Sequence, residues 1–186
     1  MRKLTVFNFT TLNGYFKGPG DDTSWHAHDE EGSKFAQDAL GADGILLFGR
    51  KTYDMMASFW PTDNAKQMMP EVAEGMNKSD KIVFSKTLKQ ATWENTRIIS
   101  DNIIEEVRKL KNTLGKDMAI LGSGSITTLF AQHGLIDEFQ LMIDPLLIGS
   151  GSAFCQGLNH VVELKLTQTK TFKSGRILAC YAPASK

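Results

Sequence analysis

The chain has few cysteines, no excess of positive or negative charge, and no long apolar run. The two cysteines, Cys155 and Cys180, are too few for a disulfide framework, and their spacing matches no metal or redox motif. Lysine plus arginine number 21, as do aspartate plus glutamate, so no overall field favours nucleic acid or an anionic membrane. No apolar stretch is long enough for a signal peptide or a membrane span. These absences predict a cytoplasmic protein without nucleic-acid or membrane partners.

The length and composition set what the chain can build. Its 186 residues, 41% of them hydrophobic, can bury one good core, and two domains would be cramped. We therefore predict a single domain over residues 1–186. Because the net charge is zero, any anionic ligand must be held by a local site.

The stretch Met118–Phe130 carries the clearest local motif. A short apolar run, 119–121, is followed by Gly122 and Gly124, and apolar residues then recur at helical spacing, which predicts a strand, a tight turn and a helix. Such a turn lets a ligand approach the backbone and points helix N–H groups at a phosphate. Thr127 stands where a dinucleotide fingerprint has its third glycine, and a P-loop ending is lacking. The alternative is an ordinary turn.

The N-terminal part predicts a strand followed by a long loop. Residues Leu4–Thr11 form a β-rich run in which Asn8 is the one odd residue. Asn13-Gly14 signals a turn, and the glycine-rich segment 17–25 follows. The aromatic residues of this region could close over a flat ring, or the loop could be a surface excursion; they are Tyr15, Phe16 and Trp25.

Residues 29–59 predict helix, strand and helix. Asp29–Leu40 has acids in its first turn and an apolar face, and Ile45–Phe48 is an apolar run typical of a strand covered on both faces. Gly49, Arg50, Lys51 and Thr52 then open a helix that runs through Phe59. Cations in a first helical turn oppose the helix dipole, so this arrangement favours a bound phosphate.

A third strand end carries similar chemistry. Ala65–Met76 predicts a methionine-rich helix interrupted near Pro70. The apolar run Lys81–Phe84 predicts a strand that ends at Ser85 and Lys86. Because open α/β sheets bind ligands at the carboxyl ends of their strands, these turns predict one crevice, unless they cluster by chance.

The C-terminal half predicts one more helix and then strands. Asn102–Leu114 has its apolar residues on one face, and Gly115 stands where a helix-ending glycine is expected. The alternating runs Leu135–Ile143, Val161–Phe172 and Ile177–Tyr181 predict antiparallel strands.

With these motifs in order, the chain resembles the dihydrofolate reductase-like superfamily. It is closer to the C-terminal reductase domain of the bifunctional riboflavin-biosynthesis deaminase/reductase and its small stand-alone relatives. The segments that carry the resemblance are Thr-Leu-Asn-Gly (11–14), Phe-Gly-Arg-Lys-Thr-Tyr (48–53), Val-Phe-Ser-Lys-Thr-Leu (83–88), Leu-Gly-Ser-Gly-Ser (121–125), Ile-Asp-Glu-Phe (136–139) and Pro-Leu-Leu-Ile-Gly-Ser-Gly (145–151). The resemblance implies a three-layer α/β fold with a mixed, mostly parallel central sheet, antiparallel C-terminal strands and bound NADPH.

The resemblance also implies a cofactor-binding set. Gly49, Arg50, Lys51 and Thr52 match the turn that holds cofactor phosphates, and Ser85 and Lys86 match positions near the adenosine 2′-phosphate. The turn under the pyrophosphate is matched by Gly122, Ser123, Gly124, Ser125 and Ile126. Arg50 and Lys86 supply positive charge, and no acid stands close to these turns in sequence, which favours NADPH over NADH.

The catalytic residues are less sharply marked. In dihydrofolate reductases an acid shortly after the loop tryptophan orients the pterin, and Glu30 has the closest spacing to Trp25, although acids also suit a helix start. Asn13 stands where stand-alone relatives usually carry aspartate, and asparagine can bind a substrate without transferring protons. His26 and His28 lack further ligands in sequence, so we predict no metal site.

These inferences predict an NADPH-dependent reductase that transfers a hydride to a small-molecule substrate. The expected substrate is a heterocycle or a ribosylated pyrimidine, as in 5-amino-6-(5-phosphoribosylamino)uracil reductase. The alternatives are dihydrofolate reductase activity and a non-catalytic nucleotide-binding module on the same fold. Relatives pair through their later strands, so the resemblance also implies a homodimer.

Overall fold

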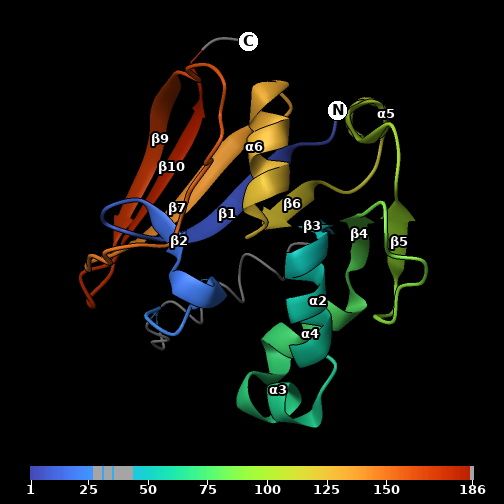
Figure 1. The fold of residues 1–186 in the computed structure, drawn as a ribbon, viewed down its shortest axis with the longest axis horizontal. Helices are drawn as coiled ribbons and strands as arrows, with labels where there is room; N and C mark the ends of the chain where they lie inside the picture. Colours follow the sequence, from blue (N-terminus) through green and yellow to red (C-terminus); the bar gives the residue numbers. More distant parts are fainter. Residues whose placement is uncertain (27–30, 32–34, 36–43, 185–186) are drawn as a thin grey trace.

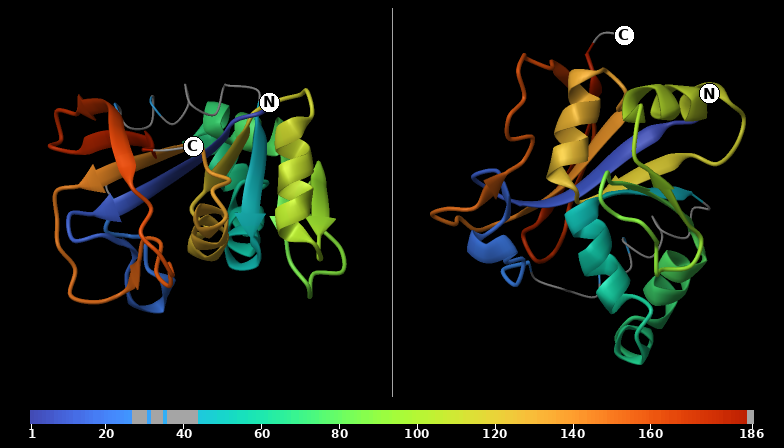
Figure 2. Two further views of the ribbon diagram at one scale, coloured as in Figure 1. Left: turned by 90° about the horizontal axis from the view of Figure 1, so that it is seen from above. Right: turned by 45° about the vertical axis from the view of Figure 1, so that its right-hand side comes forward.

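A computed structural model describes residues 1–26, 31, 35 and 44–184, and these residues fold around one eight-stranded sheet (Figure 1). The strands are β1 (Leu4–Thr11), β3 (Ile45–Gly49), β4 (Asp80–Phe84), β5 (Thr96–Ile99), β6 (Met118–Leu121), β7 (Glu138–Asp144), β9 (Leu164–Thr171) and β10 (Ile177–Pro183). Their order in the sheet is β5-β4-β3-β6-β1-β7-β10-β9. The six strands from β5 to β7 are parallel, and β10 is antiparallel to both of its neighbours. Figure 2 shows the strands fanning out between the β9 and β5 edges.

Helices cover both faces of the sheet around β3 and β4, whose consecutive residues are buried on both sides. The helices are α2 (Arg50–Phe59), α3 (Asp63–Met68), α4 (Pro70–Lys78), α5 (Ile103–Asn112) and α6 (Gly124–Gln132). On one face, Leu47 belongs to a buried cluster with residues of α5 and α6, such as Val107 and Phe130. On the other face, Phe48 belongs to a second buried cluster with Tyr53 of α2 and Met76 of α4. In Figure 1, α2, α3 and α4 are grouped at one end of the molecule.

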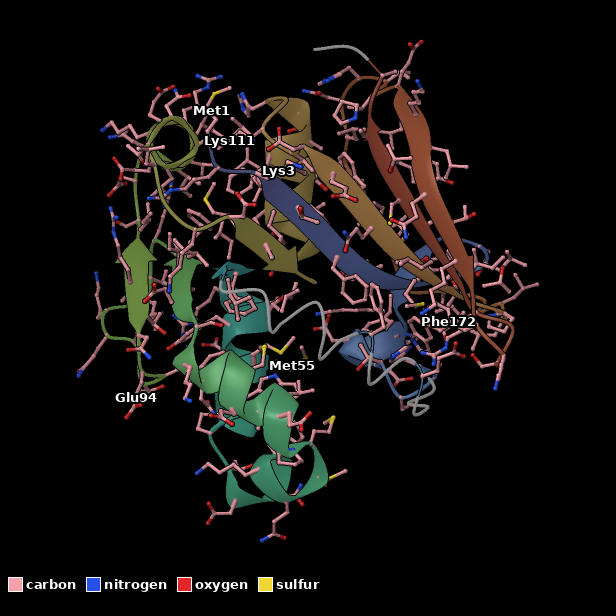
Figure 3. The ribbon with its side chains drawn as sticks, turned by 180° about the vertical axis from the view of Figure 1, so that it is seen from behind. Met1, Lys3, Met55, Glu94, Lys111 and Phe172 are labelled. Carbon is pink, nitrogen blue, oxygen red and sulfur yellow. The ribbon has the colours of Figure 1, made fainter. Side chains whose placement is uncertain are left out.

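The ends of β1 are fixed by contacts with distant segments. At its N-terminal end the Leu4 N–H donates to the Asp137 carboxylate (2.8 Å), which also pairs with Lys111. Figure 3 shows Lys3 beside Lys111 here, with Phe172 at the opposite end of the strand. The Asp137 carboxylate therefore holds together β1, α5 and the start of β7, which is a structural role.

A small second sheet lies beside the carboxyl end of β1. It pairs β2 (Tyr15–Lys17) with β8 (Ser152–Ala153) in antiparallel fashion. Gly151 is required at this crossing, since a Cβ atom there would overlap the Lys17 carbonyl oxygen and its φ is +150°. The start of the predicted glycine-rich loop is thus joined to the segment that follows Gly151.

Most of the predicted elements are confirmed. The strand Leu4–Thr11 has the predicted bounds, and α3 and α4 divide at Pro70 as expected. The predicted helix Asp29–Leu40 lies largely outside the described residues. Among the alternating C-terminal runs, β7 is antiparallel to β10 but parallel to β1, because α6 carries the chain back before β7 begins.

The predicted end of the helix 102–114 is wrong. The helix α5 ends at Asn112, and Thr113 turns the chain into an extended conformation while its hydroxyl donates to the Leu110 carbonyl (3.0 Å). Leu114 is 94% exposed and lies off the apolar face. Gly115 makes room for the Arg2 guanidinium instead, since a Cβ atom there would overlap it.

None of the described helices is long and apolar enough to cross a membrane.

Candidate functional site

Two helix N-termini meet at the carboxyl edge of the sheet. The helix α2 begins directly after β3, and α6 begins just after the turn that follows β6. The Gly49 N–H donates to the Ser123 hydroxyl (3.0 Å), which links the two turns. A Cβ atom on Gly49 would lie 3.5 Å from both the Ser125 hydroxyl and the Ile126 side chain. The two predicted phosphate turns, 49–52 and 122–126, are therefore in direct contact.

The N-termini of α2 and α6 are electrostatically alike and differ from those of the other described helices. Neither has a side-chain cap or an acid in its first turn. By contrast, α3, α4 and α5 carry Asp63, Glu71 and the pair Glu105 and Glu106 in their first turns. Uncapped N–H groups and the positive end of the helix dipole both favour a bound anion. Two such ends side by side form a candidate anion site without a compensating carboxylate in either first turn.

The turn between β6 and α6 is built on left-handed backbone. Gly122 has a φ of +68° and Ser123 a φ of +58°, and Ser123 is nearly fully buried. Thr127, fully buried, donates its hydroxyl to the Gly122 carbonyl (3.4 Å) and its N–H to the Ser123 carbonyl (3.1 Å). The threonine that replaces the third glycine of the fingerprint thus helps to hold the turn in place.

Phe16, from β2, covers Gly124. A Cβ atom on Gly124 would lie 2.6 Å from Phe16 Cζ and 3.0 Å from Phe16 Cε1. The absence of a side chain at Gly124 therefore lets an aromatic ring of the N-terminal loop rest on the first turn of α6. An aromatic residue of this loop does lie at the glycine turn.

The cations of the first turn of α2 are exposed or half-exposed. Arg50 donates through Nε to both carboxylate oxygens of Asp54 (2.8 and 2.7 Å), and both side chains keep substantial exposure, 39% and 51%. Lys51 is exposed, whereas Thr52 is buried against Gly122, with Thr52 Cγ2 3.5 Å from the Cβ position of that glycine. Asp54, two residues beyond this turn in sequence, therefore offsets part of its positive charge, so the expectation that no acid stands close is wrong for this turn.

Ser85 and Lys86 continue the edge of the sheet beyond Gly49, since Phe84 pairs with Gly49 in the parallel ladder. The Ser85 hydroxyl accepts from the backbone N–H groups of Thr87 (3.3 Å) and Leu88 (3.1 Å), so it shapes its own turn. Lys86 is exposed and lines a hollow of about 490 Å³ between the ends of β4 and β5 and the start of α5; its other lining residues are Ser100, Asp101, Asn102, Ile103, Ile104 and Glu105. Two acids that are distant in sequence therefore share this hollow with Lys86.

Comparison with known proteins places the chain in a family. The model of the RibD C-terminal domain matches residues 2–178. The chain belongs to this family. Uncharacterized protein YyaP of Bacillus subtilis (strain 168), one relative, is 33% identical over 181 residues, which are 97% of this chain and 94% of YyaP. The family inferred from the sequence motifs is thus confirmed.

Solved structures agree on the fold. A candidate riboflavin biosynthesis protein of Shewanella sp. PV-4 superposes with a TM-score of 0.75 at 19% identity, covering 98% of this chain and 99% of that chain. Dihydrofolate reductase from Enterococcus faecalis, complexed with NADP(H), superposes with a TM-score of 0.67 at 15% identity, covering 98% and 97%. The RibD C-terminal domain of this chain therefore has the dihydrofolate reductase-like fold predicted from the sequence.

Asn13 is held by hydrogen bonds. Its Oδ1 accepts from the Thr11 hydroxyl (2.8 Å), and its Nδ2 donates to the Ile148 carbonyl (2.8 Å). The Ile148 N–H also approaches Oδ1 (3.4 Å). The side chain that we predicted to be catalytic thus ties the end of β1 to the loop that precedes β8.

The second predicted catalytic residue, Glu30, and the neighbouring His28 lie outside the described residues. His26 is described and is buried: its Nδ1 lies 3.0 Å from Asp144 Oδ2, and the two side chains are only 7% and 2% exposed. The His26 ring also packs on Phe9, with the ring centroids 3.6 Å apart. One signal for this pair is present in the sequence: Asp144 is an acid that directly follows the alternating run Leu135–Ile143 and precedes Pro145.

Proposed function

We propose that this protein is an NADPH-dependent reductase that transfers a hydride to a small heterocyclic or ribosylated pyrimidine substrate. The observation that carries the proposal is the contact between two uncapped, acid-free helix N-termini at the carboxyl edge of the sheet. Membership in the RibD C-terminal domain family supports the substrate class. The NADP(H) complex of the Enterococcus faecalis reductase, which has the same fold, supports the cofactor.

The residues of the site fit the phosphate groups of a dinucleotide. The first turns of α2 and α6 would hold the pyrophosphate through backbone N–H groups, and Arg50 would add charge at its edge. Lys86 would face the adenosine end in the hollow beside α5. The bound cofactor supplies the hydride, while the chain binds and orients the rings and excludes water from them. Phe16 is placed to form part of the wall between the glycine turn and solvent.

Cofactor binding is the first test. The thermal unfolding midpoint and the tryptophan fluorescence should both change on titration with NADPH, and NADPH should bind more tightly than NADH if Lys86 outweighs Asp101 and Glu105. A protein that responds to neither dinucleotide at millimolar concentration does not have the proposed function.

The chain offers a matched pair of arginines for mapping the site. Arg50 pairs with Asp54 on α2, and Arg97 on β5 pairs with Glu106 on α5; the two arginine side chains are 39% and 59% exposed. Arg50→Gln should weaken NADPH binding about tenfold, the loss of roughly one charge-assisted hydrogen bond, and should reduce its dependence on salt. Arg97→Gln should leave the affinity unchanged. Equal effects of the two substitutions would place the phosphates elsewhere.

Turnover then separates the candidate functions. NADPH oxidation should be faster with a ribosylaminopyrimidine than with dihydrofolate. Preference for dihydrofolate, with loss of turnover in Glu30→Gln at neutral pH, would identify a dihydrofolate reductase instead. Binding of NADPH without oxidation by either substrate class would identify a nucleotide-binding module.

A further inference from the structure

Asn8 is a buried polar residue whose side chain has no structural task in the described part of the protein. It is 4% exposed and lies on the same face of β1 as the core residues Leu4 and Val6. Its amide nitrogen is enclosed and has no hydrogen-bond partner among the described residues. An unsatisfied buried donor lowers stability, and an apolar side chain of similar shape would serve the core better. The asparagine therefore has to be explained by something other than packing.

The location of Asn8 gives that explanation, because it lies at the candidate site. The last β1–β6 pair is Phe7 with Leu121, so Asn8 is the first residue of β1 beyond the end of β6. Asn8 Oδ1 lies 3.8 Å from the Cβ position of Gly122, and Thr52 Cγ2 lies 3.5 Å from the same point. Three elements thus meet around Gly122: β1 through Asn8, the first turn of α2 through Thr52, and the turn that opens α6.

We propose that Asn8 is a cofactor-binding residue whose amide N–H donates a hydrogen bond to an oxygen of the dinucleotide. Half a turn of the carboxamide about χ2 brings the amide nitrogen to the position of Oδ1, on the Gly122 side, where it joins the backbone donors of α2 and α6. A ligand group beside these donors must be an acceptor, and the central part of a dinucleotide offers phosphate and ribose oxygens. The inference rests on the proposed cofactor and adds a side-chain donor from β1 to it.

The competing role for Asn8 is a structural one, in which the amide binds an enclosed water molecule. The two roles differ in what an apolar replacement does. If Asn8 serves the cofactor, Asn8→Leu removes an unsatisfied donor from the free protein, so thermal stability holds or rises while NADPH binding weakens. If Asn8 serves a water, the same substitution lowers thermal stability and leaves the affinity for NADPH unchanged.

The experiment measures the melting temperature of the free protein and the dissociation constant of NADPH by calorimetry for four chains. These are the wild type, Asn8→Leu, Asn8→Asp and the control Thr5→Val, which changes β1 at its N-terminal half. Asn8→Leu should bind NADPH about tenfold more weakly without a lower melting temperature. Asn8→Asp should also bind weakly at neutral pH and recover as the pH falls, because a protonated carboxyl can donate again. Thr5→Val should bind as the wild type does.

The outcomes separate this inference from the proposed function. If the wild type does not bind NADPH, the proposed function fails and Asn8 has no cofactor to bind. If the wild type binds and Asn8→Leu binds within about twofold of it, Asn8 is not a cofactor-binding residue and the proposed function stands. Should Asn8→Leu fail to fold, Asn8→Asp decides: an affinity within about twofold of the wild type at neutral pH overturns the inference.

Discussion

Replacing Gly124 with alanine should have opposite effects on stability in two backgrounds. The backbone of Gly124 does not lie in the left-handed region, so alanine can adopt it without strain. The added Cβ atom, however, would lie 2.6 Å from Phe16 Cζ, closer than carbon atoms pack. Gly124→Ala therefore restricts the unfolded chain, which favours folding, and at the same time overpacks the contact with β2.

The two contributions have different sizes. Replacing glycine by alanine where the backbone suits both residues gains about 0.4–1 kcal/mol, chiefly because it restricts the unfolded chain. Overpacking of a well-filled contact costs about 1–3 kcal/mol. The net result in the wild-type background should be a loss of about 1 kcal/mol in the free energy of unfolding. In a Phe16→Ala background the clash is gone, and Gly124→Ala should instead gain about 0.5 kcal/mol.

Urea unfolding of the wild type, both single variants and the double variant measures this difference as a double-mutant cycle. NADPH titration of the same four chains adds the functional comparison. Binding should weaken with Gly124→Ala in both backgrounds if the methyl group occupies space that the pyrophosphate needs.

One result would refute the reasoning about stability. If Gly124→Ala changes the free energy of unfolding equally in both backgrounds, Phe16 is not the group that restricts this position. A Gly124→Ala protein that binds NADPH normally in the Phe16→Ala background would show that the cofactor does not approach this turn.

Three further expectations follow from other parts of the molecule. His26→Ala should lower the free energy of unfolding by about 3 kcal/mol, because it leaves the buried Asp144 carboxylate without its 3.0 Å partner; a loss below about 1 kcal/mol in urea unfolding would contradict this. Burial lowers the pKa of the Lys81 ammonium to about 8 from its ordinary 10.5. The folded chain then binds fewer protons than the unfolded chain between these values, so stability should rise with pH across that window, and Lys81→Met should remove the rise in urea unfolding at several pH values. We also propose a homodimer paired along β9, an edge strand whose eight residues are all exposed, and Leu166→Lys should then give a monomer in light scattering; a wild type that is itself monomeric would refute the pairing.

The elements that the sequence predicted well are those whose signal is local. The apolar run Ile45–Phe48 forms β3, and the glycine turn after Leu121 opens α6. Hydrophobic periodicity and glycine placement depend on neighbouring residues alone, so they can be interpreted without the fold.

The features that the sequence did not reveal depend on contacts between distant segments. The pair His26 and Asp144 is separated by 118 residues. The β2–β8 sheet is too short to give an alternating pattern, so the position of Phe16 over Gly124 could not be predicted. Asp101 joins the hollow beside Lys86 only because β4 and β5 end side by side.

Asn8 is an intermediate case. The sequence showed it as the odd residue in a β-rich run, which marked it as unusual without indicating a partner. Its significance depends on register, because β1 extends beyond β6 from this residue onward. The role of a polar residue in a buried strand can therefore be interpreted only when the ends of the neighbouring strands are known.

The position of β6 has a consequence for the order in which the protein can assemble. This strand fills the gap between β1 and β3, yet it is made after both, and its pairing of Leu4 with Met118 joins widely separated parts of the chain. A nascent chain that has reached β5 has two flanking strands and an open slot between them, so the sheet cannot close during the first half of synthesis. Long-range closure of this kind slows folding. The same late insertion brings the α6 turn against α2, so these two helix N-termini meet only once β6 is in place.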